Sequence, residues 1–216
     1  MINRIADEIA YRIKNGTTWI ETSVGIVKPV TSKSKGGADV TEPIYFNTER
    51  NFCNGADYIS LAPNSSKKSI CYFEINGKPR VEESGRKGTS FVATLTAIVW
   101  VNYNKINIGM IDTDILVADF LQTLPQTLPT DGYYNRVLLD VASVEIQNGD
   151  VFNKYSYNDQ QQYLMYPYDY FTVDINVSYT IPKGCFDLVL NPDECNIKPN
   201  IVLVESEDGV NEILKY

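Results

Sequence analysis

Residues Tyr168–Ile181 read YDYFTVDINVSYTI, and from Phe171 onward apolar and polar side chains alternate without a break. One parity is apolar or aromatic and the other mostly polar: Phe171, Val173, Ile175, Val177, Tyr179 and Ile181 against Tyr170, Thr172, Asp174, Asn176, Ser178 and Thr180. Successive side chains of a strand point to opposite faces of its sheet. The segment therefore predicts a strand with one dry face and one face that is wet or covered by a partner. It is also much longer than the usual ~5–6 residues.

Two further segments predict long strands with a different pattern. Thr89–Ile106 has apolar residues on both parities, which is typical of a central strand that is covered on both faces. Asn135–Gln147 contains VLLDVASVEI and again has two mostly apolar parities.

Two helices are predicted beside these strands. Apolar residues at helical spacing indicate an amphipathic helix over about residues 2–14, which Asn15-Gly16 ends. A second, short helix is predicted to begin at Asp112 or Thr113 and to stop before Pro125. Asp112 and Asp114 are interpreted as carboxylates favoured by the helix dipole, in preference to a metal or catalytic pair.

The segment between the first helix and Thr89 predicts several shorter strands. Thr18–Val30 is predicted as a first strand, and Asn76-Gly77 predicts a hairpin turn. The residues TSKSKGGAD at Thr31–Asp39 are interpreted as a mobile loop or hairpin tip, or as a loop that becomes ordered against a partner. The remaining strand candidates are Pro43–Asn47, Tyr58–Leu61, Ser69–Ile75 and Pro79–Glu83.

This order predicts an α+β fold, in which both helices cover one face of a mainly antiparallel sheet of long strands. We expect a single domain over residues 1–182, with residues 31–88 as a β-rich insertion, and a C-terminal extension over residues 183–216. In that extension, Ile201–Glu205 is predicted as an edge strand and Val210–Tyr216 as a short final helix or a disordered tail.

Charge and hydropathy limit the classes of function. The 216 residues carry 19 basic and 27 acidic side chains and a formal charge of −8, which argues against a protein that reads nucleic-acid sequence. Simple solubility is the plainer explanation of that charge. No apolar stretch approaches the ~20 residues that span a bilayer, and the N-terminus lacks the apolar region of a secretory signal. We therefore expect a soluble protein that is made in the cytoplasm and does not contact a membrane.

Catalysis is not expected. The chain has no histidine, which excludes Ser-His-Asp and Cys-His mechanisms, and it has no nucleotide-binding or metalloprotease motif. Its four cysteines (Cys53, Cys71, Cys185 and Cys195) form no CxxC pair, so we expect neither a zinc site nor another cofactor. Cys185 and Cys195 could pair under oxidation, but reduced thiols are favoured. Asp140, Asp169 and Asp174 are interpreted as solvated residues on strands.

Tyrosines are dense before and within the opening stretch, at Tyr155, Tyr157, Tyr163, Tyr166, Tyr168 and Tyr170. Three interpretations stay open: packing in the core, a protein interface, or stacking on single-stranded nucleic acid. The last would need interleaved basic residues, and only Lys154 is near.

The residues SFVATLTAIVWVNYNKI, RVLLDVASVEI and LMYPYDYF, with the short first helix, resemble tail-terminator and head–tail joining proteins of tailed bacteriophages. The likeness is greatest to neck ring proteins of the crAss-like phages, and it covers about residues 1–30 and 89–181. Residues 31–88 and 183–216 depart from a minimal terminator.

This resemblance implies a structural virion protein of the neck or tail. Such proteins form closed homo-oligomeric rings, here expected to hold six or twelve copies, between the portal or adaptor and the tail proteins. DNA passes through the ring without sequence-specific binding. The candidate interface residues are Ser32, Lys33, Lys35, Trp100, Tyr163, Tyr166, Tyr168 and Tyr170. The alternative is a binding module for a ligand or a protein that uses the Tyr-rich loop 163–170.

Overall fold

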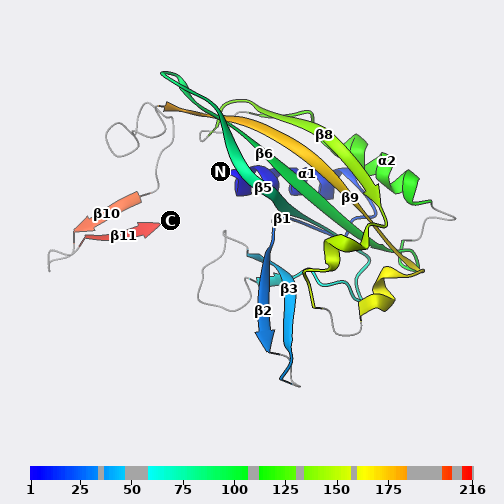
Figure 1. Cartoon of the computed structure of the whole chain (residues 1–216). Coiled ribbons are helices and arrows are strands. Elements are labelled where there is room, and N and C mark those ends of the chain that lie inside the picture. The colour runs from blue at the N-terminus through cyan, green and yellow to red at the C-terminus, as the bar shows by residue number, and fades with distance from the viewer. Residues whose placement is uncertain are drawn as a thin grey trace.

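A computed structural model of the chain describes residues 1–33, 37–46, 58–106, 112–129, 134–156, 160–183, 201–205 and 211–215. Its centre is a six-stranded sheet in the order β1-β5-β6-β9-β8-β7 (Figure 1). The strands are β1 (Thr22–Ile26), β5 (Ser69–Gly85), β6 (Gly88–Asn102), β7 (Thr127–Leu128), β8 (Val137–Ile146) and β9 (Tyr168–Pro182). Only the β1–β5 pair is parallel, and the other neighbours are antiparallel. The predicted α+β class is confirmed.

The alternating stretch that opens the sequence is β9, one of the two central strands. It pairs with β6 over the full length of both strands, from Gly88↔Pro182 to Asn102↔Tyr168. Its apolar parity is buried: Phe171, Val173 and Val177 are 0 % exposed. The prediction of one dry face is therefore confirmed.

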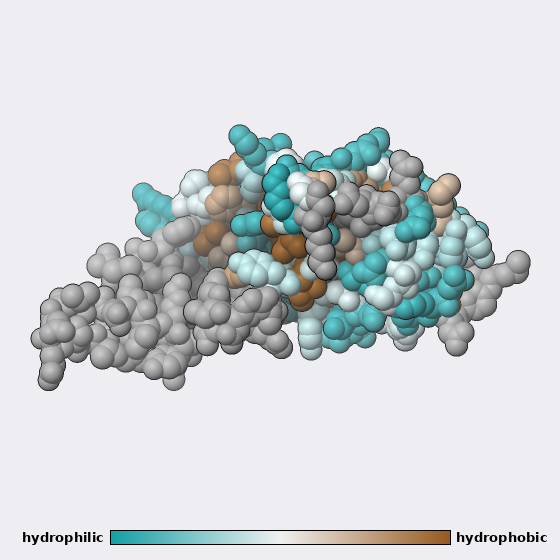
Figure 2. All heavy atoms as spheres, turned by 90° about the horizontal axis from the view of Figure 1, so that it is seen from below, coloured by the Kyte–Doolittle hydropathy of each residue, from teal (hydrophilic) through white to brown (hydrophobic). Residues whose placement is uncertain are grey.

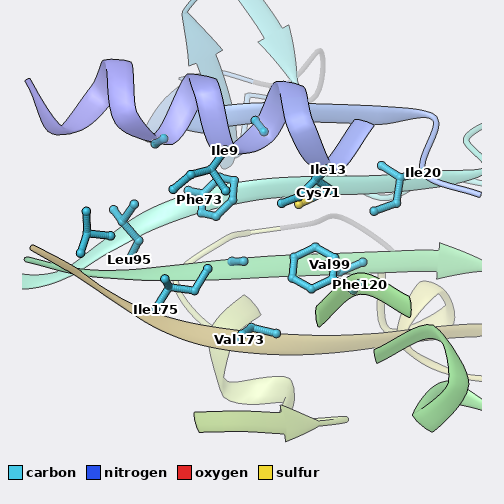
Figure 3. Packing of buried hydrophobic residues seen from close by; sticks show 14 of the residues in the cluster. Ile9, Ile13, Ile20, Cys71, Phe73, Leu95, Val99, Phe120, Val173 and Ile175 are labelled. Carbon is cyan, nitrogen blue, oxygen red and sulfur yellow. The ribbon is translucent and has the colours of Figure 1, made fainter. Parts of the chain in front are cut away.

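Both helices lie on that dry face, as predicted. α1 (Ile2–Gly16) buries Ile5, Ile9 and Ile13, which join a core cluster that also contains Phe73 of β5. α2 (Thr113–Thr123) adds Leu116, Val117 and Phe120 to the same cluster. Figure 3 shows Ile9 and Ile13 directed at the strand that carries Phe73 and Cys71. Each such aliphatic or aromatic side chain contributes roughly 1.5–3 kcal/mol by burial.

Among the described residues, the opposite face of the sheet is covered at one end only. There Trp100, Ile98 and Tyr170 join a second buried cluster with Leu61 and Phe152. Two short 3-10 helices, η1 (Gly149–Phe152) and η2 (Gln160–Leu164), contribute Phe152 and the partly buried Tyr163 and Leu164 to it. β6 is thus covered on both faces near Trp100, while the remainder of this face is polar.

A separate three-stranded antiparallel sheet lies outside the main one and has the order β2-β3-β4. Its strands are β2 (Lys28–Lys33), β3 (Asp39–Phe46) and β4 (Tyr58–Ser60). The single strand predicted at Thr18–Val30 is therefore wrong, because the chain leaves the main sheet at Val27, whose N–H donates to the Phe73 carbonyl at 2.9 Å.

Viewed from below, the described surface is largely hydrophilic, with hydrophobic residues gathered near its middle (Figure 2).

The hairpin predicted at Asn76-Gly77 does not form. β5 runs through this point, and three residues of β5 lie between the pairs Asn76↔Thr94 and Arg80↔Val92 where β6 has one. Gly77 has φ of +79°, a conformation that a β-bulge uses as readily as a turn. The actual turn follows Gly85, so residues 69–85 of the expected insertion are a strand of the main sheet.

The described part of the C-terminal extension is a hairpin. β10 (Ile201–Glu205) pairs antiparallel with β11 (Asn211–Lys215) in a two-stranded sheet of their own. The final helix predicted at Val210–Tyr216 is therefore wrong.

Cys53, Cys185 and Cys195 lie outside the described residues. Among the described helices, none combines the length and the apolar character needed to cross a membrane.

Candidate assembly surface

β8 leaves one side of the main sheet open. β7 pairs only with Val137 and Leu138, and the Leu139 N–H donates to the Gln126 carbonyl at 3.0 Å. From Asp140 to Ile146, no described strand pairs with β8 on its outer side. We call this segment the β8 edge. Its aliphatic side chains Val141 and Ile146 are each 42 % exposed.

A second open surface lies on the opposite side of the same sheet. β1 pairs with β5 only as far as Phe73, so Ile75–Gly85 has no described strand on its outer side. This segment, the β5 arm, runs with β6 to a hairpin tip that extends past the helices in Figure 1. Every side chain of the arm is exposed, including Ile75 at 37 % and Val81 at 54 %.

The sheet face between these two surfaces is polar and hollowed. Thr94 Oγ1 donates to Asn176 Oδ1 at 3.0 Å, and Thr96 Oγ1 donates to Asp174 Oδ1 at 2.6 Å. A hollow of about 580 Å³ is lined partly by Lys78, Arg80 and Asp140, and a second of about 350 Å³ by Glu74, Glu145 and Asp174. Asn76 lines both hollows, so they adjoin on this face, and we call the two together the polar groove.

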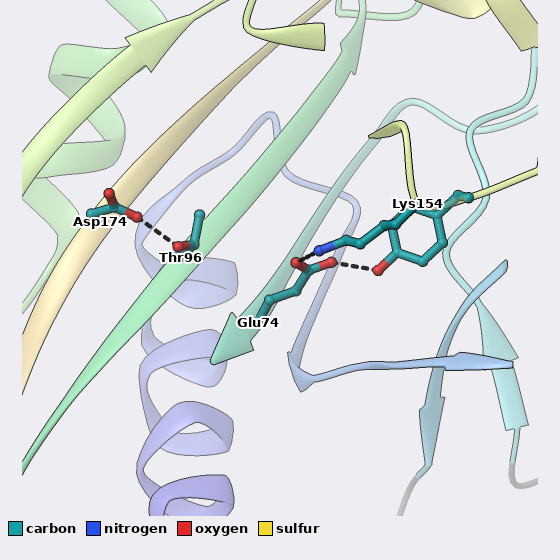
Figure 4. A network of polar contacts seen from close by, with 5 residues as sticks. Glu74, Thr96, Lys154 and Asp174 are labelled. Carbon is teal, nitrogen blue, oxygen red and sulfur yellow. Dashed lines mark hydrogen bonds and ion pairs between the residues drawn. The ribbon is translucent and has the colours of Figure 1, made fainter. Parts of the chain in front are cut away.

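An ion pair lies at the inner end of this groove. Lys154 Nζ and the Tyr155 hydroxyl both donate to the carboxylate of Glu74, as Figure 4 shows beside the Thr96–Asp174 bond. Burial lowers the pKa of Lys154. Each charge in the pair has its counterpart, so the arrangement is a structural anchor between the turn after η1 and β5. In the described residues, no group of three or more Cys, Asp or Glu side chains is placed to hold a metal ion.

Asp169 differs from its predicted role. It is 6 % exposed and does not belong to the wet face. Its Oδ2 accepts from the Tyr103 hydroxyl at 3.2 Å and from Thr113 Oγ1, and its Oδ1 accepts from the Tyr170 N–H at 2.8 Å. The carboxylate thus joins β9 to the first residue of α2. Asp112 is the N-cap of α2, as predicted, although its side chain makes no capping hydrogen bond. Asp174 and Asp140 do lie on the polar face.

Most of the predicted aromatic interface residues pack inside the subunit. Trp100 is 0 % exposed, stacks on Tyr168 at 5.2 Å between ring centroids, and donates from Nε1 to the Tyr163 carbonyl at 2.7 Å. Tyr170 is 6 % exposed. Among these aromatic candidates, only Tyr166 is largely exposed to solvent, at 88 %. The structure therefore brings Trp100, Tyr163, Tyr168 and Tyr170 together, but as part of the second core cluster.

The predicted loop residues lie on the small sheet. Ser32 and Lys33 are exposed on β2, and Lys33 Nζ lies 2.7 Å from Asp39 Oδ1. Lys35 lies outside the described residues. None of the candidates falls on the β8 edge or the β5 arm. A signal for the β8 edge was present in the sequence, because Asn135–Gln147 has too many aliphatic residues for a strand with a solvated side.

Comparison of the chain with protein-family models, with curated proteins and with solved structures gives no significant match.

Proposed function

We propose that this chain is a structural virion protein of a tailed phage. In this proposal it assembles into a closed ring of six or twelve copies in the neck or tail. The ring joins the portal or adaptor to the tail proteins and lets DNA pass. It acts by assembly and not by catalysis.

The observation that supports this function is the pair of open surfaces on opposite sides of one sheet. A closed ring needs a heterologous interface, in which one patch of each subunit meets a different patch of the next. The β8 edge and the β5 arm are two such patches, and both expose aliphatic side chains. The helix face is already covered by α1 and α2 over its centre, so the exposed aliphatic area of this face is at the sides of the sheet.

The charge of the chain suits a conduit for DNA. Affinity for DNA comes mainly from Lys and Arg that neutralise phosphates. The formal charge is −8, and the polar groove places Asp140, Asp174 and Glu145 beside hydroxyl and amide groups. Acidic side chains outnumber basic ones along the groove by five to three, so its net charge repels the phosphate backbone weakly.

The test is the mass and shape of the purified full-length protein. Native mass spectrometry and negative-stain electron microscopy should show closed rings with a single copy number, six or twelve. Images of the phage particle should show the same ring between head and tail. A protein that stays monomeric at millimolar concentration and is missing from the neck and tail of the particle would disprove the function.

A second candidate is a binding module, which the exposure of Met165 at 64 % and Tyr166 at 88 % favours. These adjacent side chains form an apolar tip between η2 and β9. In that case Tyr166→Ala would abolish ligand or partner binding and leave the oligomeric state unchanged. Loss of the ring in Tyr166→Ala would instead assign this tip to assembly.

A further inference from the structure

We propose that the β8 edge of one copy docks against the β5 arm of the next copy, and that this single contact, repeated, closes the ring. The inference rests on the proposed function and deepens it by naming the two surfaces that meet. It follows from the way each surface distributes its side chains between the two faces of the sheet.

On the helix side, both surfaces carry exposed aliphatic residues. In the β8 edge, Val141 pairs with Ile175 and Ile146 pairs with Phe171, and both of these partners belong to the helix-side core. In the β5 arm, Ile75 pairs with Leu95 of the same core, and Val81 pairs with Phe91, which packs against it. When the two sides of the sheet are brought together, aliphatic residues therefore meet aliphatic residues.

On the polar side, both surfaces carry charges. Asp140 pairs with Asn176 and Glu145 pairs with Thr172, which places both carboxylates on the polar side of the β8 edge. Lys78, Arg80 and Glu82 line the polar groove from the β5 arm. No ion pair joins Lys78, Arg80 or Asp140 to another side chain in the described part of the chain.

The net charges on the polar sides of the two surfaces are opposite. The β8 edge holds two acidic residues and no basic one, whereas the β5 arm places Lys78 and Arg80 in the groove against Glu82 alone, and Arg86 and Lys87 follow at the hairpin tip. Opposite charges at the rim of a contact steer association and fix its register. The aliphatic residues stabilise the contact by burial, and the charges fix its orientation.

The backbone of both surfaces shapes the contact. β8 has an irregularity between Val141 and Ser143, and β5 has two, the first of which contains Pro79. Bulges and proline on an edge strand interrupt continuous pairing with another strand. The two surfaces therefore meet mainly through side chains, which limits the contact to this one complementary pair and disfavours open-ended aggregation.

A charge swap in the full-length protein tests the docking. Asp140→Lys with Glu145→Lys places basic residues on both surfaces, and Lys78→Glu with Arg80→Glu places acidic residues on both. All four side chains are exposed, so each variant should keep the melting temperature of the wild type. We expect each double variant to lose the ring and to run as a monomer. The chain that carries all four substitutions should regain the ring, because its surfaces are again opposite in sign.

Mixing the two double variants gives a more specific test of the docking. When the two defective variants are mixed in equal amounts, each surface finds an oppositely charged partner only on the other variant. Rings should therefore return with strictly alternating subunits, which requires an even number of copies. As a control for Lys78→Glu with Arg80→Glu, Lys14→Glu with Lys28→Glu makes the same change in net charge away from both surfaces, and it should leave the ring intact.

The outcomes separate the two proposals. Rings in the wild type that persist in both double variants would overturn the docking and leave the ring function standing. Loss of the ring in the double variants without rescue, either in the quadruple variant or on mixing, would also overturn it. A wild type that never forms a ring would overturn both.

Discussion

Asp169 shows how one buried carboxylate can hold two elements together. Both of its oxygens accept hydrogen bonds, and the donors come from β9, from Thr113 of α2 and from Tyr103 after β6. Removing a buried charged partner leaves its donors unsatisfied, which costs roughly 1–3 kcal/mol for each such group. We expect Asp169→Ala to lower the free energy of unfolding by about 2–4 kcal/mol in urea denaturation.

Asp114 gives the matched control for that measurement. It lies in the first turn of α2 and is exposed, so Asp114→Ala removes only a favourable dipole interaction, worth about 0.3–1 kcal/mol. Equal losses in the two variants would show that the Asp169 network does not anchor α2.

The thiol of Cys71 and the hydroxyl of Tyr103 predict a loss of stability at high pH. Burial raises the pKa of Cys71 from 9.0 to about 12 and that of Tyr103 from 10.0 to about 12. Between these values the folded chain holds protons that the unfolded chain releases, so the free energy of unfolding falls as the pH rises above about 9. Denaturation at pH 7.5, 9 and 10 should show this decline. Cys71→Val should make it shallower, and an unchanged slope in that variant would exclude the thiol as a cause.

Three glycines of the β5–β6 hairpin predict a graded response at the level of the element. At Gly88, with φ of +154°, a Cβ would lie 2.4 Å from the Ile181 carbonyl oxygen. Gly77 has φ of +79° with open space around it, and at Gly85 the space is open and the φ ordinary. We expect Gly88→Ala to cost about 2–3 kcal/mol, Gly77→Ala about 1 kcal/mol and Gly85→Ala close to zero, as measured by thermal unfolding. Equal effects at Gly85 and Gly88 would contradict the close approach of β6 to β9.

The tyrosines before and within β9 predict a contrast between neighbours. Tyr168 stacks on the buried Trp100, whereas Tyr166 is 88 % exposed. We expect Tyr168→Ala to lower the free energy of unfolding by about 2–4 kcal/mol and Tyr166→Ala to change it by less than about 0.5 kcal/mol. Chemical denaturation followed by tryptophan fluorescence measures both, and a large loss in Tyr166→Ala would contradict its exposed position.

The elements that could be predicted from the sequence are those whose pattern has one physical cause. The alternation in β9 and the helical spacing in α1 each follow from a single buried face, and both were predicted correctly. Asn76-Gly77 was ambiguous, because a positive φ at glycine serves a turn or a bulge, and only the pairing of β5 with β6 decides between them.

The candidate site was harder to predict than the fold. Asp169 shares the parity of Phe171, so the alternation rule places it on the helix side. Because Asp is polar, it was nevertheless assigned to the solvated face. The aromatic candidates other than Tyr166 are in the second core cluster because tyrosine packs inside a subunit as well as between subunits. An open strand edge depends on which strands are neighbours, and a local pattern does not contain that information.

At the scale of the whole molecule, the strands of the main sheet extend beyond the region that the two helices cover. α1 and α2 cover the centre of the helix face, while the β8 edge and the β5 arm extend beyond this cover with aliphatic residues exposed. The aliphatic surface that the main sheet leaves for a neighbour is therefore lateral. This arrangement favours growth around a ring over stacking of sheets face to face.

A lysine at the β8 edge should separate folding from assembly. A charged side chain on an open strand edge blocks contact with another chain, and Val141 is exposed enough to be replaced without disturbing the core. In a ring, one such lysine in each copy affects every interface at once. We expect Val141→Lys to keep the wild-type melting temperature within about 2–4 °C, the shift that a change of 1 kcal/mol causes in a chain of this size. The same variant should elute as a monomer in size-exclusion chromatography with light scattering. Ile115→Lys on α2, at a side chain that is 60 % exposed, makes the same chemical change on the helix layer and should retain the ring. A Val141→Lys protein that still forms rings of the wild-type mass would remove the β8 edge from the interface, and with it the reason to regard the sides of the sheet as the contact surfaces.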